Sequence, residues 1–305
     1  QVLRAGLCGS DIHSYCGREQ GMAVHTTRGH ELCGRVAAST CHSFAVGDFV
    51  FSPFSTCCGN CVFCNAGLTA RCSQGALLGW VDERTGVGLQ GAQAQFVKIP
   101  LPSSTLVRVP EGLSLSEAVL CGDILSTGYY AVFNGLGLPV DTSAAHDAHA
   151  PWKPSSGFLS SSILIVGCGP VGLCAVLCAL YCADLVSRAN ADTHLIVYAY
   201  DPCAPRAAMA RSLGASCVES IEDFLGKTVI GADVVVEAVG SPSALTTALH
   251  AVRPGGTISS VGVHTAQFPA SFTPEDVYNK NLTFKCGRCP ARAIASLAVK
   301  VLAWA

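Results

Sequence analysis

A cluster of cysteines stands in the stretch CCGNCVFCNAGLTARC, residues 57–72. Apart from Cys57, the spacing reads Cys58-x2-Cys61-x2-Cys64-x7-Cys72. Two-residue gaps let successive sulfurs converge on one point while the backbone turns tightly, which is the geometry of a tetrahedral four-cysteine zinc site. Such a site is closed and does no chemistry, so we predict a structural zinc. The alternative is a disulfide cluster, which needs an oxidising compartment.

A second set of candidate ligands and proton carriers lies near the start of the chain, in GLCGSDIH and GHE. Taken singly, Cys8 is more often a core residue, and His30 is more often a polar residue with its hydrogen bonds satisfied. A catalytic zinc takes three protein ligands and keeps a fourth position for water or substrate. Hydride removal from an alcohol needs an alkoxide, which zinc favours by lowering the pKa of bound oxygen. Beside a nucleotide-binding fold, six residues become candidates for binding such a zinc ion or for carrying the substrate proton. They are Cys8, Ser10, Asp11, His13, His30 and Glu31.

A glycine motif supplies the nucleotide-binding fold. Gly167-x-Gly169-x-x-Gly172 follows an expected strand and opens an expected helix. The first glycine permits a tight turn, the second lets the backbone approach a pyrophosphate, and the third packs helix on strand. The pyrophosphate then meets the free N–H groups of the helix N-terminus. The cofactor-binding residues predicted here are Gly167, Gly169, Pro170, Val171 and Gly172.

Cofactor preference depends on the end of the next expected strand, where Asp201 stands. A carboxylate there accepts hydrogen bonds from ribose hydroxyls and repels a 2′-phosphate, which favours NAD over NADP. The spacing from Gly172 exceeds the usual ~20 residues, and the polar SRANADTH is interpreted as a loop insertion. Arg206 is a candidate for the opposite preference, because a guanidinium accommodates a phosphate. The alternative for Arg206 is a solvated residue in the first turn of its helix.

The elements that must position these groups change character along the chain. The first 120 or so residues contain short strand signals separated by Gly, Pro and Ser: GRVAAS, GDFVFSP, AQFVKIP and LVRVPEG. This pattern predicts an antiparallel barrel or sandwich. SLSEAVLCGDILSTGYYAVFN predicts a helix, capped by Ser114 or Ser116. The polar segment VDTSAAHDAHAPWKPSSG reads as a surface insertion with solvated His146 and His149.

Strands and helices then alternate, as in a doubly wound parallel sheet. Residues 161–183 carry no charge and are long enough to pass for a membrane span. Their order argues otherwise: a β-branched run, a Gly/Pro turn and an apolar helix are typical of a buried strand feeding a buried helix.

The composition of the chain limits the number of domains, the kinds of partner and the cellular compartment that it suits. The chain has 305 residues, 50% of them hydrophobic, which suits two cored domains. Only 13% are charged and the net charge is −2, so nothing favours nucleic acid or an anionic membrane as a partner. Most of the 18 cysteines are scattered in apolar runs, as expected for a reduced, cytoplasmic protein. There is no signal peptide, and without an initiator methionine we expect the true start to lie upstream.

The motifs together resemble the medium-chain, zinc-containing alcohol dehydrogenases, with a GroES-like catalytic domain joined to a Rossmann domain. The resemblance runs from residue 1 to about Arg292, interrupted at about 141–157 and 187–193. It is carried by GLCGSDIH, GHELCGRV, GDFV, the cysteine lobe, DILSTGYYA, VGCGPVGL and RPGGTISSVGV. DILSTGY and KNLTFKCGRCPAR make the chain similar to the branch with glutathione-independent formaldehyde, threonine and polyol dehydrogenases.

The resemblance implies a role for each site residue. Cys8, His30 and Asp123 would bind catalytic zinc, with Asp123 where many relatives have cysteine. Glu31 would exchange into the metal shell, and Asp11 would orient His30. Ser10 would take the substrate proton and pass it through the cofactor ribose to His13. Thr127 would lie against the nicotinamide. The structural zinc would be held by Cys58, Cys61, Cys64 and Cys72.

The resemblance also implies the domain plan and the cofactors. We expect a GroES-like domain at 1–125 with its lobe at 57–72, an NAD-binding Rossmann domain at 126–285, and a truncated return to the first domain at 286–305. Two zinc ions, NAD, a small alcohol or aldehyde substrate and a homodimer or homotetramer would accompany them. The alternatives are a polyol or threonine dehydrogenase, an inactive truncated relative, and a thiol-based redox or zinc-buffering protein suggested by Cys57.

Overall fold

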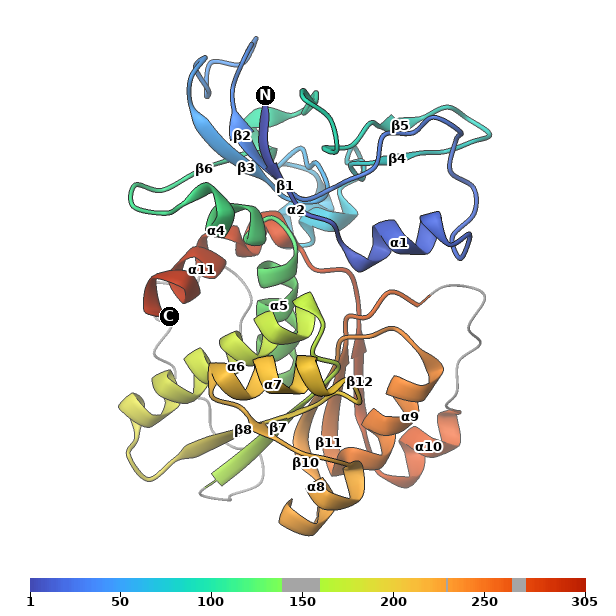
Figure 1. The fold of residues 1–305 in the computed structure, drawn as a ribbon, viewed down its shortest axis with the longest axis vertical. Coiled ribbons are helices and arrows are strands. Elements are labelled where there is room, and N and C mark those ends of the chain that lie inside the picture. The colour runs from blue at the N-terminus through green and yellow to red at the C-terminus, as the bar shows by residue number, and fades with distance from the viewer. Residues whose placement is uncertain (139–159, 229, 265–272) are drawn as a thin grey trace. The chain divides into compact units, whose positions relative to one another are not determined.

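The structure is a computed structural model, and it describes residues 1–138, 160–228, 230–264 and 273–305 (Figure 1). The insertion at 141–157, with His146 and His149, lies outside the described residues. The described backbone forms two compact units. The first comprises Gln1–Ser126 and Cys289–Leu302, and the second comprises Thr127–Arg288 and Ala303–Ala305.

The first unit is built on an antiparallel sheet. Its strands run in the order β1 (Val2–Ala5), β2 (Leu32–Arg35), β3 (Phe49–Ser52) and β6 (Val107–Arg108). A separate antiparallel pair joins β4 (Trp80–Val81) to β5 (Gly88–Leu89). Short antiparallel strands are therefore confirmed, but residues 94–100 form no strand. The carbonyl of Gln95 in that segment accepts a hydrogen bond from Val2 N of β1, but the segment does not continue as a paired strand.

Small apolar clusters and short helices complete this unit. One cluster contains Leu32, Leu78 and Ala92, and another contains Phe44, Val50 and Leu106. The helices are α1 (Gly9–Tyr15), α2 (Val62–Asn65), the 3-10 turn η1 (Thr69–Arg71), α3 (Pro102–Thr105), α4 (Leu115–Leu120) and most of α11 (Ala291–Trp304).

The expected helix at 114–134 is two helices, α4 and α5 (Ile124–Leu136). Ser114 is the cap of α4, in a capping box with Glu117: its Oγ accepts from Glu117 N at 3.2 Å, and Glu117 Oε2 accepts from Ser114 N at 2.8 Å. The break falls at Gly122, whose carbonyl accepts from Phe54 N at 3.1 Å. A Cβ at Gly122 would collide with the Ser52 carbonyl, so glycine is required there.

The second unit is a doubly wound sheet, as predicted. Every described pairing in it is parallel, and the strand order is β12-β11-β10-β7-β8-β9. The order is that of two mononucleotide-binding halves that diverge from a switch point between β7 and β10. The strands are β7 (Ser160–Val166), β8 (His194–Tyr200), β9 (Ser216–Cys217), β10 (Ala232–Glu237), β11 (Val252–Ser260) and β12 (Thr283–Cys286). The helices between them are α6 (Pro170–Ala189), α7 (Ala204–Leu213), α8 (Ile221–Thr228), α9 (Pro242–Ala251) and α10 (Pro274–Asn279).

The last residues of five strands lie in register across the carboxyl edge of this sheet. Tyr200 pairs with Val166, Val166 with Glu237, Glu237 with Ser260, and Ser260 with Cys286. Because ligands of open α/β sheets bind beyond the carboxyl ends of the strands, this row marks the edge where a dinucleotide would lie.

The apolar stretch that could pass for a membrane span is β7 followed by α6. By length and composition α6 could cross a bilayer. In the structure it packs against β7 and β8, and its buried residues include Ala175, Val176 and Ala179. The interpretation of SRANADTH as a loop was wrong in part, because α6 continues through Ser187 to Ala189 and only residues 190–193 link it to β8.

Candidate metal and dinucleotide sites

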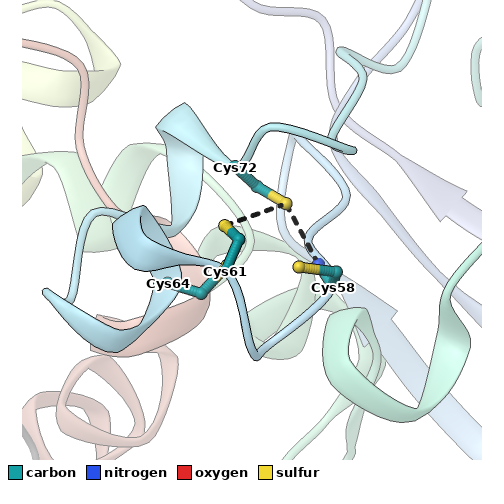
Figure 2. A group of neighbouring side chains, drawn as sticks. All are labelled: Cys58, Cys61, Cys64 and Cys72. Carbon is teal, nitrogen blue, oxygen red and sulfur yellow. Dashed lines mark hydrogen bonds between the residues drawn. The ribbon is translucent and has the colours of Figure 1, made fainter.

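The cysteine lobe brings four sulfur atoms together. The Sγ atoms of Cys58, Cys61, Cys64 and Cys72 all lie within 4.8 Å of one another (Figure 2). The sulfurs of Cys61 and Cys72 are 3.9 Å apart. A tetrahedral ion with Zn–S bonds of ~2.3 Å holds its sulfurs about 3.8 Å apart, whereas a disulfide needs ~2.05 Å. The set therefore fits zinc and contains no disulfide.

Backbone groups prepare this lobe for thiolates. Cys72 Sγ accepts from Cys58 N at 3.2 Å and from Gln74 N at 3.4 Å. Backbone N–H groups of Cys64 and Ser73 lower the pKa of Cys61 to about 5, whereas burial and the neighbouring thiols raise the pKa of Cys64 to about 12. Four thiolates at these distances would repel one another, and a divalent cation bound between them would offset that repulsion.

Cys57 has a different environment from the lobe. Its thiol is buried and donates to Ser104 O at 3.1 Å, and its backbone N donates to Thr105 Oγ1 at 3.0 Å. Burial also raises the pKa of the Cys57 thiol. The residue anchors the start of the lobe to α3 and gives no support to a redox role.

The second predicted metal group also converges. Ligand atoms of Cys8, His30, Glu31 and Asp123 all lie within 4.8 Å of one another. Cys8 is the N-cap of α1, His30 and Glu31 directly precede β2, and Asp123 directly precedes α5. His30 Nε2 is 3.0 Å from Asp123 Oδ2, and tetrahedral zinc would hold such a pair about 3.4 Å apart.

A buried carboxylate fixes the other side of the imidazole. Asp11 Oδ1 lies 3.6 Å from His30 Nδ1, and Asp11 Oδ2 accepts from Cys8 N at 3.1 Å. Burial disfavours a charged His30, but hydrogen bonds with Asp11, Asp123 and Cys8 outweigh it and raise the pKa of the imidazole to about 12. With Nδ1 facing Asp11, Nε2 is the nitrogen directed at the ligand group, as in carboxylate–histidine–metal triads.

Sequence reasoning missed Arg28, which supports Asp11. Its guanidinium lies 3.5 Å from Asp11 Oδ1 and donates to Gly79 O at 2.7 Å. The signal was its position two residues before His30 in TTRGHE. In a sequence alone, an arginine does not indicate such a buried, supporting role, because most arginines are exposed.

Glu31 is buried beside the other three ligands. Its Oε1 has no hydrogen-bond partner among the described residues, which is costly unless a cation is close. Burial, aided by the Asp123 carboxylate, raises the pKa of Glu31 to about 7. A Cβ at Gly6 would collide with Glu31 Oε2, so the glycine of GLCGSD makes room for this side chain. The donor set and the orphaned oxygen both fit a zinc ion.

Cys121 is a softer ligand than Asp123 but lies outside this group. It is fully buried at the end of α4, where its thiol lies 3.9 Å from Glu117 O. Burial raises the pKa of Cys121 to about 12, and its sulfur is not among the ligand atoms that lie within 4.8 Å of one another. The geometry thus favours Asp123.

The proton-path residues stand on two helices. Ser10 and His13 are half-buried in α1, and His13 Nδ1 has no hydrogen-bond partner among the described residues. Thr127 is buried in the first turn of α5. Their roles in proton transfer and nicotinamide contact stay predictions.

The glycine motif has the geometry of a pyrophosphate cradle. Gly167 has φ +90°, and a Cβ at Gly172 would collide with its carbonyl. A Cβ at Gly169 would meet no protein atom within 4 Å, so that face of the loop is open. Pro170 and Val171 begin α6, with Gly169 as its N-cap. The open cradle at a helix N-terminus fits a dinucleotide.

Asp201 follows β8 and is tied to that motif. Its Oδ2 accepts from Cys168 N at 2.7 Å, and its Oδ1 accepts from Cys203 N at 2.8 Å. Each oxygen keeps a lone pair for a ribose hydroxyl. Arg206 is exposed in the first turn of α7.

Comparison with known proteins gives the same picture. Residues 1–111 match the alcohol dehydrogenase GroES-like domain, and residues 170–300 match the zinc-binding dehydrogenase domain. The chain is 35% identical over 288 residues to the medium chain reductase/dehydrogenase ucsI of Acremonium sp, covering 90% of this chain and 87% of that protein. The chain belongs to the medium-chain zinc-type alcohol dehydrogenase family.

Two further members of the family illustrate the match. Zinc-type alcohol dehydrogenase B of Aspergillus flavus is 38% identical over 312 residues, which cover 99% of this chain and 65% of that protein. The structure of alcohol dehydrogenase TADH from Thermus sp. ATN1 superposes with a TM-score of 0.77 at 32% identity, covering 98% of this chain and 79% of that one. The expected family, fold class and oxidoreductase class are confirmed. Membership in the zinc-type alcohol dehydrogenases implies zinc and a nicotinamide cofactor.

Within this family framework Asp201 is expected to set cofactor preference. Asp201→Ser removes the charge that repels a 2′-phosphate and the acceptor for ribose hydroxyls, so the ratio of NAD to NADP efficiency should fall by about an order of magnitude or more. Asp201→Asn is the control, because it can keep the acceptor for Cys168 N while losing the charge. Steady-state kinetics with both cofactors measures the ratio. An unchanged ratio would transfer the role to Arg206 or the neighbouring loop.

Proposed function

We propose that the chain is a zinc-dependent oxidoreductase that transfers a hydride from an alcohol, or from an aldehyde hydrate such as hydrated formaldehyde, to NAD. The observation that carries this proposal is the grouping of Cys8, His30, Glu31 and Asp123, whose ligand atoms lie within 4.8 Å of one another and of which the last three are buried. One thiolate, one neutral imidazole and one carboxylate formally neutralise Zn²⁺, and Glu31 adds a further carboxylate beside them. When bound, zinc supplies Lewis acidity toward an oxygen ligand.

The chain's own residues would carry the rest of the reaction. Asp11 holds His30 with Nε2 toward the ligand group. Ser10 would accept the substrate hydroxyl proton, and His13 would pass it toward solvent. Thr127 would position the nicotinamide. The cysteine lobe would hold a second, structural zinc, which gives two zinc ions per chain.

NAD is favoured over NADP by Asp201, whose carboxylate would meet the adenosine ribose. A cytoplasmic location and a homodimer or homotetramer belong to the same proposal. The support for the location is the number of thiols, since reduced cytosol maintains them.

A polyol or threonine dehydrogenase on the same scaffold is the second candidate. It is favoured by relatives named sorbitol dehydrogenase, from Bacillus subtilis at 31% identity, and L-threonine 3-dehydrogenase, from Caldanaerobacter subterraneus at 27%. The candidate from another class is an inactive relative that binds nucleotide without turnover.

A substrate panel separates these candidates. NAD reduction is measured with primary alcohols, formaldehyde, sorbitol and L-threonine, alongside zinc content by elemental analysis. The proposed function predicts the highest kcat/KM for a primary alcohol or formaldehyde. Preference for sorbitol or threonine would move the assignment to the second candidate. Nucleotide binding without reduction of NAD by any panel member, in zinc-replete protein, would favour the inactive relative.

Gly169 provides a test of the cofactor site that leaves folding intact. Its φ of −70° suits any residue, a Cβ there meets no protein atom, and aspartate is a favoured N-cap for α6. In Gly169→Asp the new carboxylate would face the pyrophosphate, so the Kd for NADH should rise by about a hundredfold or more. Fluorescence titration measures the Kd, and thermal unfolding should show no loss of stability. Gly169→Ala is the matched control for the added Cβ. Unchanged affinity in Gly169→Asp would place the pyrophosphate elsewhere.

A further inference from the structure

A buried carboxylate organises the carboxyl edge of the second half of the sheet. Glu237 ends β10 and is fully buried. Its Oε1 accepts from Val239 N at 2.8 Å and from Gly240 N at 2.6 Å, and its Oε2 accepts from Ser260 Oγ at 2.7 Å. These bonds satisfy the carboxylate and fix the loop that follows β10.

His264 is held on this carboxylate. Its Nε2 lies 2.9 Å from Ser260 Oγ and 3.5 Å from Glu237 Oε2. Since Nε2 faces the buried pair, ring geometry turns Nδ1 away from it, and the side chain is 29% exposed. The hydrogen bond with Glu237 raises the pKa of His264.

A hydrolytic Ser–His–Glu triad does not explain this arrangement. Ser260 is buried within β11 and gives its proton to Glu237 rather than to His264. A nucleophilic hydroxyl needs access to a substrate and a base that takes its proton. The cluster instead presents one positioned nitrogen, Nδ1 of His264.

The position of His264 matches a known recognition point in the other half of the sheet. The halves are β7-β8-β9 and β10-β11-β12. Asp201 follows the second strand of the first half, where a ribose is recognised, and His264 follows the second strand of the second half. The intervening loops are contiguous: a Cβ at Gly167 would collide with Val239, and a Cβ at Gly240 would lie 2.5 Å from Val263 O.

We propose that His264 is a cofactor-contacting residue, whose Nδ1 forms a hydrogen bond with a hydroxyl of the ribose in the nicotinamide half of the dinucleotide. This inference rests on the proposed function, because it requires that the sheet binds a nicotinamide dinucleotide. Glu237 and Ser260 act as positioning residues that fix the ring and its tautomer.

The test uses three substitutions that separate the two ring nitrogens. His264→Ala removes both, His264→Gln carries an amide near the position of Nε2, and His264→Asn carries one near the position of Nδ1. The matched control is His250→Ala, because His250 is an exposed histidine of the same unit on α9. Dissociation constants are measured by calorimetry for NADH, for ADP-ribose and for AMP, which lacks the second ribose. Thermal unfolding checks that each variant is folded.

The expected pattern is specific to the second ribose. In His264→Ala and His264→Gln the Kd for NADH and for ADP-ribose should rise by about tenfold, the effect of losing one hydrogen bond. AMP should bind as before, His264→Asn should retain most of the affinity, and His250→Ala should match the unsubstituted chain.

Other patterns overturn the inference in distinguishable ways. Equal loss of AMP and NADH binding would indicate a general disturbance of the sheet edge. Unchanged NADH binding in His264→Ala, or equal loss in His264→Asn and His264→Ala, would exclude the Nδ1 contact while leaving the proposed function in place. Failure of the unsubstituted, folded chain to bind NADH would overturn both.

Discussion

Asp123→Asn is expected to abolish turnover and to weaken one of the two zinc ions. Asn keeps the shape of the side chain but loses the charge that would complete the ligand set of Cys8 and His30. Loss of groups that merely support a metal ligand costs up to about 100-fold in metal affinity or activity, so loss of a ligand should cost more. The measurements are kcat/KM for alcohol oxidation in an active preparation and zinc content per chain.

Cys121→Ser is the matched comparison, because Cys121 stands two residues earlier and sulfur is the softer donor. Its buried thiol lies 3.9 Å from Glu117 O, outside the ligand group. We expect both zinc ions and nearly full activity to survive, with a stability loss of about 1–3 kcal/mol from placing a hydroxyl in an apolar site. Zinc loss in Cys121→Ser with activity retained in Asp123→Asn would overturn the assignment of the third ligand.

The second large effect concerns the lobe at 57–72. Cys61→Ser leaves three ligands and an incomplete tetrahedron, so the chain should lose about one zinc ion and the lobe should unfold locally. If the site contributes several kcal/mol, the Tm should fall by about 10 °C, since 1 kcal/mol corresponds to about 2–4 °C for a domain of 150–250 residues. Elemental analysis and thermal unfolding measure the two quantities.

Cys16→Ser is the control for this experiment, because Cys16 is exposed and belongs to neither metal group. It should leave zinc content and Tm unchanged. Full zinc content and an unchanged Tm in Cys61→Ser would count decisively against a structural zinc. Reversible zinc release from the unsubstituted protein under mild oxidation would instead favour the redox alternative.

Sequence reasoning was strongest where a short spacing determines geometry. The cysteine gaps predict converging sulfurs, and GCGPVG predicts a strand, a tight turn and a helix. Strand–helix alternation predicts the parallel sheet. In each case the groups that meet are close in sequence or lie on adjacent elements, so local chemistry suffices.

The other features of the fold and of the candidate site depend on contacts between residues that lie far apart in the sequence. The assignment of Asp123 as a metal ligand came from the family resemblance, and His30 meets Asp123 across 93 positions. The cluster of Glu237, Ser260 and His264 gave no sequence signal, because pairing of β10 with β11 brings Ser260 to Glu237. The helix α8, the strand β12 and the break at Gly122 were also missed. An i, i+3 pattern continues across such a break even when the backbone turns to meet Phe54.

The place of β7 in the sheet has a consequence for the order of events during synthesis. β7 leaves the ribosome with an apolar centre, Ile163, Leu164 and Ile165, and pairs with β8 on one side. Its other edge stays unpaired until β10 has been synthesised. Ser162 N, for example, donates to the carboxylate of Asp233, which lies 71 residues further along the chain. Parallel pairings over such separations are slow, and an open apolar edge in a half-made sheet invites association with other nascent chains. We therefore expect a chaperone to be most useful to this chain while β7, β8 and β9 have been synthesised and β10 has not.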